Sequence, residues 1–146
     1  ELADGLPGGD ALRGKAVFRG PKAGCSTCHS MAYHGGQFGP DLTRIGQVRK
    51  KMDLLEAIVF PSASFVRSYE TMQVSTGDGG VLAGIVSDQD AGQVTLALSP
   101  EKSVRVERGN IRNLEPLHVS LMPAGMNTIL TQQQLADLIA YLEASR

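Results

Sequence analysis

The sequence predicts a mainly α-helical fold with a small inserted antiparallel β-sheet, α+β overall. Apolar residues recur at helical spacing near both ends of the chain, around residues 10–18 and 131–142. Between them, from about residue 68 to 115, apolar and polar residues alternate as in short strands. Glycine-rich turns separate these strands, and Asp78-Gly79 is the strongest hairpin signal among them. We therefore expect one domain over residues 1–146, with a β insertion at about 68–115.

The first predicted helix begins after Asp10, whose side chain is a good N-cap. Leu12, Ala16 and Val17 follow at helical spacing, and their apolar stripe continues to about Phe18. This helix lies directly before the two cysteines of the chain.

Two more helices are predicted further along the chain. Residues 51–59 suit a helix that is stopped by Pro61. Thr131 and Gln134 form a capping box for the last helix. Its apolar face repeats at i, i+3, i+4 and i+7 through Leu135, Leu138, Ile139 and Leu142.

The alternating region contains four predicted strands, separated by turn-forming segments. They are Tyr69–Thr76, Val81–Ser87, Gln93–Leu98 and Ser103–Glu107. Nothing in this region resembles a catalytic site, because it lacks His and Cys and its carboxylates are scattered among turns.

Composition excludes several classes of protein. The chain has 146 residues, of which 42% are hydrophobic and 20% charged, as in ordinary globular domains. No apolar run is long enough to span a bilayer. A net charge of −1 argues against a dedicated nucleic-acid binder.

The charge is unevenly distributed. Residues 1–51 contain eight basic and four acidic residues, a net +4 on the segment that holds the cysteines. This segment either steers an acidic redox partner or simply forms solvated helix faces. The chain opens at Glu1 without an initiator Met, which suggests a mature exported product or a piece of a longer protein.

Both cysteines belong to the motif Cys25-Ser26-Thr27-Cys28-His29, the C-x-x-C-H signature of haem c attachment. Two thiols on one helical turn each add to a haem vinyl group, and the adjacent His29 directs its imidazole at the iron. The motif thus predicts one covalent haem c, held by Cys25 and Cys28 and ligated by His29.

Other readings of the cysteines are weaker. A disulfide across two residues closes a tiny loop and stabilises little. A thioredoxin-like pair needs a βαβ setting, whereas the preceding sequence is helical and glycine-rich. A zinc site needs four ligands, and no second ligand pair accompanies Cys25, Cys28, His29 and His34.

The chain resembles the class I cytochrome c family in two separated blocks. The first comprises Gly9–Phe18, the CSTCH motif and Gly39-Pro40-Asp41-Leu42; the second comprises Leu121–Gly125 and Leu130–Leu142. The resemblance implies the helical cytochrome fold and electron transfer. It also implies that Gly14 allows the first and last helices to approach closely, with Phe18 and Tyr141 packed beside it.

The same resemblance implies the remaining ligand roles. Met122, in the Met-Pro segment before the last helix, is the expected sixth iron ligand, with Met126, His118 and His34 as alternatives. The carbonyl of Pro40 is expected to accept from His29 Nδ1 and so set the tautomer of the ligand. Arg44 is a possible contact of a haem propionate.

The helical and β elements together also resemble haem-binding domains at the C-termini of multidomain dehydrogenase-like proteins of planctomycetes and verrucomicrobia. Phe60-Pro61-Ser62, Tyr69-Glu70 and Asp78-Gly79 carry this likeness. It implies a periplasmic or otherwise exported bacterial electron carrier, not itself an enzyme. Its partner is then a redox protein or a neighbouring dehydrogenase domain. The alternatives are a gas or redox sensor and a peroxidase-like enzyme with a labile sixth ligand.

Overall fold

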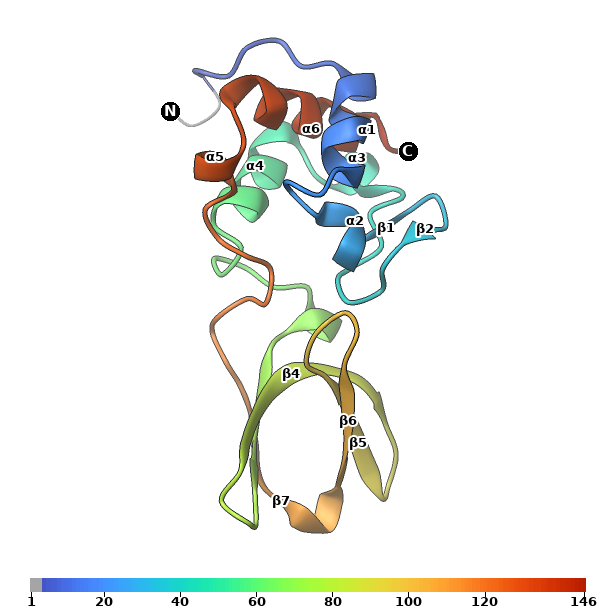
Figure 1. The fold of residues 1–146 in the computed structure, drawn as a ribbon, viewed down its shortest axis with the longest axis vertical. Coiled ribbons are helices and arrows are strands. Elements are labelled where there is room, and N and C mark those ends of the chain that lie inside the picture. Colours follow the sequence, from blue (N-terminus) through green and yellow to red (C-terminus); the bar gives the residue numbers. More distant parts are fainter. Residues whose placement is uncertain (1–3) are drawn as a thin grey trace. The chain divides into compact units, whose positions relative to one another are not determined.

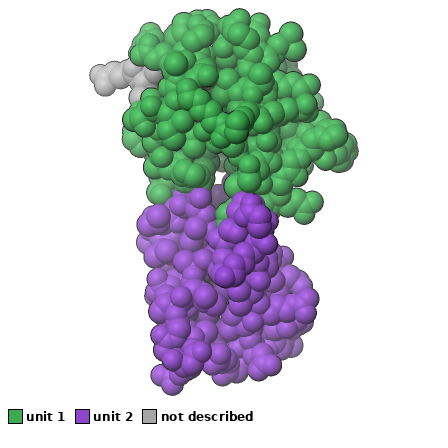
Figure 2. Space-filling model, viewed as in Figure 1, with its two compact units in different colours: residues 1–64, 122–146 green, residues 65–121 purple. Residues whose placement is uncertain are grey.

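The computed structural model describes residues 4–146, and the chain divides into two compact units (Figure 2). We call them the helical unit, Glu1–Ser64 with Met122–Arg146, and the sheet unit, Phe65–Leu121. Residues 1–3, which the predicted domain includes, lie outside the described residues. The helical unit is therefore made from both ends of the chain, and the sheet unit from one continuous segment.

The prediction of a mainly α-helical class I cytochrome c fold is wrong. Helices take up 34% of the chain and strands 24%, and the strands form a five-stranded and a two-stranded antiparallel sheet. The physical reason lies in the five-stranded sheet, which buries an apolar cluster of its own and forms a compact unit. The helical periodicity at the chain ends describes only the other unit.

Within its described residues, the helical unit contains six helices and one short hairpin, which Figure 1 labels. The helices are α1 (Ala11–Arg19), α2 (Cys25–Cys28), α3 (Ile45–Val48), α4 (Lys51–Val59), α5 (Met126–Ile129) and α6 (Gln132–Ala144). The hairpin pairs β1 (Ser30–Met31) with β2 (His34–Gly35). Side chains from α1, α4, α5 and α6 meet in one apolar core.

Helix α1 packs directly against α6 (Figure 1). Gly14 makes this approach possible, because a Cβ atom there would lie only 1.9 Å from the backbone oxygen of Asp137. The rings of Phe18 and Tyr141 pack beside it, with centroids 5.6 Å apart. The predicted roles of these three residues in helix packing are confirmed. The predicted apolar stripe is wrong at Leu12, which is 79% exposed, and at Ala16, which is also exposed.

The caps of the long helices follow the sequence closely. Asp10 accepts a hydrogen bond from Arg13 N at 2.8 Å and begins α1. Thr131 and Gln134 form the predicted capping box, with bonds of 3.1 and 3.0 Å between side chain and backbone. The predicted apolar face of α6 is buried at all four positions. Helix α4 occupies residues 51–59, as predicted, and ends before Pro61.

The sheet unit is a five-stranded antiparallel sheet in the order β6-β5-β4-β3-β7. Its strands are β3 (Met72–Thr76), β4 (Val81–Gln89), β5 (Gln93–Ala97), β6 (Ser103–Glu107) and β7 (Ile111–Pro116). Short 3-10 helices, η1 (Arg67–Tyr69) and η2 (Arg108–Asn110), precede β3 and β7. The first four strands lie where the alternating pattern predicts them.

Strand β7 has no counterpart in the sequence-based prediction. Its half-buried residues Ile111 and Leu114 are three apart, a spacing that does not match the two-residue period of a strand. The pairing register with β3 shifts between Ser75 and Thr76, which pair with Asn113 and Ile111, so Arg112 is an extra residue. This bulge lets both apolar side chains pack against the same cluster.

The sheet unit has its own small core, formed by Val74, Leu96 and Val106. These residues are at most 5% exposed. Among the helices of the described residues, none has the length and apolar character needed to cross a membrane.

Candidate haem-attachment site

The CSTCH motif forms α2, a single helical turn that follows α1 closely. Gly24 begins it in the left-handed region, with φ 64°, which glycine adopts without strain. Because Cys25 and Cys28 are three residues apart on this turn, their side chains leave the same side of the helix. Both are thiols rather than a disulfide. Two adjacent thiols on one helical face are what attachment to two haem vinyl groups requires.

His29 ends the helical turn and leaves it in an extended conformation. Its backbone N–H still donates to Cys25 O at 2.9 Å, so the turn positions the residue. Its side-chain Nδ1 lies 2.8 Å from Pro40 O, the contact that the family resemblance implies. A carbonyl oxygen only accepts hydrogen bonds, so Nδ1 carries the proton. In the neutral ring, Nε2 therefore holds the free lone pair.

Gly39 packs against the imidazole of His29. A Cβ at this position would lie 2.6 Å from Cε1 and 2.8 Å from Nδ1 of the ring. No side chain fits there unless the ring moves. Gly39 N also donates to Cys28 O at 2.7 Å, so the Gly39-Pro40 segment is joined to the motif helix. The histidine ring is thus fixed both by contact with Gly39 and by its hydrogen bond to Pro40.

Two further glycines, Gly35 and Gly36, also hold the backbone of the motif in place. Gly36 N donates to Ser26 O at 2.9 Å, and a Cβ on Gly36 would lie 2.0 Å from Thr27 O. Gly35 has φ 122°, and a Cβ there would lie 2.2 Å from His29 O. These close contacts hold residues 26–29 against the returning loop without any side-chain interaction.

The electrostatics of the motif favour neutral side chains. Burial lowers the pKa of His29, although the hydrogen bond to Pro40 partly opposes this shift. Burial also raises the pKa of the Cys25 thiol, with the nearby Cys28 adding to the effect. Thiol–disulfide exchange sites have lowered thiol pKa values instead. The raised pKa of Cys25 therefore argues against the thioredoxin-like alternative.

Met122 is half-buried and packs against the apolar core of the helical unit. Cys25 packs against the same core, so the structure brings a predicted haem thiol and the predicted sixth ligand to one cluster. Met126, the first residue of α5, is 6% exposed and belongs to the cluster itself.

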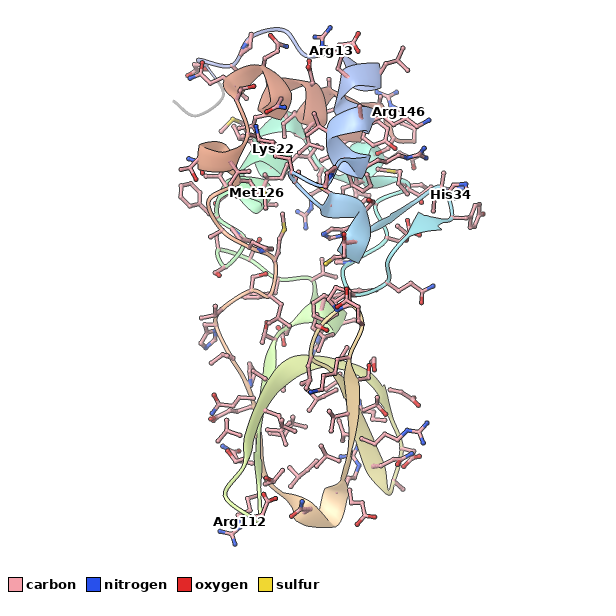
Figure 3. All side chains as sticks on the ribbon, in the orientation of Figure 1. Arg13, Lys22, His34, Arg112, Met126 and Arg146 are labelled. Carbon is pink, nitrogen blue, oxygen red and sulfur yellow. The ribbon has the colours of Figure 1, made fainter. Side chains whose placement is uncertain are left out.

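The histidine alternatives and Arg44 lie at the surface. His34 is exposed on β2, opposite Met126 in the view of Figure 3. His118 is also exposed and belongs to the sheet unit. Arg44 is exposed directly before α3.

Sequence reasoning missed a buried carboxylate near the end of the chain, Asp137. Asp137 on α6 is 2% exposed and receives two bonds of 2.8 Å from the guanidinium of Arg13. Asp10 N and Gln133 Nε2 also donate to it, at 2.7 and 2.9 Å. These bonds, that of Arg13 first, lower the pKa of Asp137 to about 2. Asp137 directly follows Leu135 and Ala136 in the sequence. Aspartate is usually exposed, so nothing in the sequence indicated that this side chain is buried.

Comparison with known proteins finds no family model that matches the chain and no curated protein that matches its sequence.

Proposed function

We propose that the helical unit binds one haem c covalently through Cys25 and Cys28, and that the protein transfers single electrons. The observation that supports this best is the 2.8 Å contact between His29 Nδ1 and Pro40 O. It directs the proton of the neutral ring to Nδ1 and leaves Nε2 for a metal, directly after two thiols on one turn. The proposal rests on this local arrangement and not on the overall fold.

The residues present fit a covalently attached haem. Cys25 is half-buried against the apolar core, and Cys28 lies one turn further on. A covalent link to these two cysteines holds the large apolar haem ring to the small helical unit. When bound, haem c supplies reversible one-electron chemistry at its iron. The chain contributes the attachment, the proximal ligand and the exclusion of water.

The chain prepares His29 for ligation before any metal is present. Gly39 leaves room for the ring, and Pro40 accepts its Nδ1 proton. Because burial lowers the pKa of His29, the ring stays neutral at pH 7 and its Nε2 is not blocked by a proton. Neutral imidazole is the form that binds metals.

Met122 is the proposed sixth ligand. Its thioether is a soft donor, and His/Met ligation favours the reduced state and a high potential. Its half-buried position on the core that also carries Cys25 supports this assignment. Arg44 is proposed as a propionate contact on the strength of its sequence position alone.

Ligation by both His29 and Met122 makes the protein an electron carrier rather than an enzyme. The partner that we propose is a redox protein or a neighbouring dehydrogenase domain. The location that we propose is the periplasm or another exported compartment of a bacterium.

Covalent attachment is tested by expression in a bacterial host that matures c-type cytochromes. We expect the purified protein to gain the mass of one haem and to give the pyridine haemochrome spectrum of two thioether bonds. Cys25→Ala with Cys28→Ala should carry no covalent haem. A wild-type protein that carries no covalent haem after such expression would contradict the proposal.

The sixth ligand is tested by absorption spectra of the ferric protein. A weak long-wavelength sulfur-to-iron band should be present in the wild type and absent from Met122→Ala. Met126→Ala is the matched control, because it removes a methionine four residues away, and it should keep the band. A band lost only in Met126→Ala would assign the ligand to Met126. A low-spin wild type without the band would indicate His34 or His118.

A further inference from the structure

The segment directly after the CSTCH motif is a tight hairpin with a strained tip. Strands β1 and β2 pair Met31 with His34, and two residues, Ala32 and Tyr33, connect them. Their φ values are 50° and 68°, so both lie in the left-handed region. A two-residue turn of this type usually contains Asn or Gly, which adopt positive φ with least strain. Ala32 and Tyr33 are therefore unfavourable choices for the conformation they adopt.

The returning chain holds the hairpin in place. Ala32 N donates to Thr43 Oγ1 at 2.9 Å, and Leu42 N donates to Ser30 O at 2.9 Å. Asp41 accepts from Ser30 Oγ at 3.0 Å and from Thr43 N at 2.7 Å. These bonds come from the residues that follow Pro40, the carbonyl partner of His29. The tip is therefore fixed to the same segment that orients the proposed iron ligand.

Tyr33 stands out at this tip because it is 100% exposed. It contributes nothing to the core, and its backbone conformation would suit glycine better. A strained backbone that holds an exposed aromatic side chain points to a role outside the folded unit. Tyrosine is among the residues that carry most binding energy at protein interfaces.

A cavity of about 390 Å³ lies beside the hairpin. Its lining residues come from α1, α2 and the hairpin: Phe18, Arg19, Ser26, Met31, His34 and Gly35. Phe18 and Met31 are buried, whereas Arg19 and His34 are exposed. The cavity thus combines two apolar core residues with a guanidinium, an imidazole and a hydroxyl, which suits a carboxylate group. Figure 3 shows His34 at the outer end of the hairpin.

The charge of the cavity lining also suits an acidic partner. Arg19 supplies a positive charge to the cavity lining, and none of the six lining residues named above is acidic. The carboxylate of Asp41 is occupied by Ser30 and Thr43 within the hairpin loop. Ser26, between the two cysteines, lines the cavity itself, so a partner seated there lies next to the haem-attachment turn.

We propose that the β1–β2 hairpin and the adjacent cavity form the docking surface for an acidic electron-transfer protein. A carboxylate of the partner enters the cavity at Arg19, and Tyr33 packs on the surface of the partner. This proposal rests on the proposed function, because it assigns the partner of the same site.

The test uses the holoprotein and reduced plant-type [2Fe–2S] ferredoxin, a small acidic electron donor. The second-order rate of ferric haem reduction is measured by stopped-flow absorption at low and high ionic strength. Arg19→Glu should lower the rate about tenfold at low ionic strength, since charged rim residues act mainly on association. Arg49→Glu is the matched control, with the same charge change at another exposed arginine of the helical unit, and it should change the rate less than about twofold.

Tyr33→Gly provides a second, uncharged variant. It should lower the ferredoxin rate several-fold while leaving the free energy of unfolding equal or higher, because glycine relieves the strain of the turn. Reduction by ascorbate at high ionic strength, where the charge of this anion is screened and no docking surface is needed, should be the same in all four proteins. High ionic strength should remove the difference between Arg19→Glu and the wild type.

Several results would overturn the docking proposal. Equal losses of the ferredoxin rate in Arg19→Glu and Arg49→Glu would show that ferredoxin is attracted by the overall charge of the protein and not by a defined surface. A parallel loss with ascorbate would show that the variants disturb the haem. A dimer in analytical ultracentrifugation that Tyr33→Gly abolishes would assign the hairpin to a second copy of this chain. Absence of covalent haem would overturn the proposed function and this proposal together, and the pyridine haemochrome assay distinguishes that case.

Discussion

The two units of this protein differ in how far along the chain their contacts reach. The helical unit joins α1 to α6, and the core between them combines residues from Phe18 to Leu142. The sheet unit is one segment in which β3, β4, β5 and β6 pair with their neighbours in sequence. Contacts over long loops cost more chain entropy than local hairpins. The haem-attachment motif thus belongs to the unit that needs both ends of the chain.

The units also differ in the chemistry they contain. All predicted haem-site residues lie in the helical unit, and only the alternative ligand His118 lies in the sheet unit. Among the described residues, twelve buried apolar residues form the helical core, and three form the cluster of the sheet unit. The candidate site therefore depends on long-range packing, whereas the sheet unit packs around a few apolar side chains.

The largest effect is expected from Leu96→Ala in the sheet unit. Leu96 is 0% exposed in a cluster of three, so its loss should lower the free energy of unfolding by about 3 kcal/mol. Urea unfolding followed by NMR amide signals should show the sheet unit lost first, with the haem spectrum unchanged. Val81→Ala, at a 62% exposed position of β4, is the control. Simultaneous loss of both units would show that they unfold as one cooperative unit and would contradict this expectation.

Gly14→Ala tests the long-range packing of the helical unit. The new Cβ would meet the backbone of Asp137, which moves only with α6, so the loss should be about 2 to 3 kcal/mol. Gly109→Ala in the sheet unit is the matched control, because a Cβ there meets nothing within 4 Å. Equal stability of the two variants in urea unfolding would contradict the close contact between α1 and α6.

Asp137→Asn tests the ionic link between the ends of the chain. It weakens charge-assisted bonds to Arg13 and should lower the free energy of unfolding by about 2 kcal/mol at pH 7. In the wild type, the pKa of Asp137 falls from 3.8 to about 2 on folding. The contribution of this carboxylate is therefore complete above pH 3.8 and disappears as the pH falls toward 2. Urea unfolding between pH 7 and 2 should show the two proteins converging at low pH.

The smallest effect on the free energy of unfolding is expected at Thr71, where the substitution should stabilise the protein. The Thr71 hydroxyl is buried, and among the described residues it has no hydrogen-bond partner. Thr71→Val should therefore raise the free energy of unfolding by about 1 kcal/mol, because it removes an unpaired buried hydroxyl. Thr76→Val is the control and should be destabilising, since Thr76 Oγ1 donates to Asp78 and contacts Gly80 O. A destabilised Thr71→Val protein would indicate a partner for this hydroxyl in solution.

The fold could be predicted in its elements but not in its class. Periodicity and caps located α1, α4 and α6, and alternation located four of the five strands of the sheet unit. Strand β7 was not predicted, because its bulge at Arg112 interrupts the alternation of apolar and polar side chains. The β1–β2 hairpin was not predicted, because its turn, Ala32-Tyr33, lacks the Asn or Gly that such turns usually contain.

The local features of this protein follow directly from its amino-acid sequence. The CSTCH motif, the Asp10 and Thr131 caps and the alternating strands are set by neighbouring residues, whose spacing and hydrogen bonding act over a few positions. Three further features arise only in the folded chain: the close contact at Gly14, the burial of Asp137 and the division into two units. These depend on pairs of residues more than a hundred positions apart or on the balance between separate cores. No local pattern reports such contacts, because they form only when the chain closes on itself.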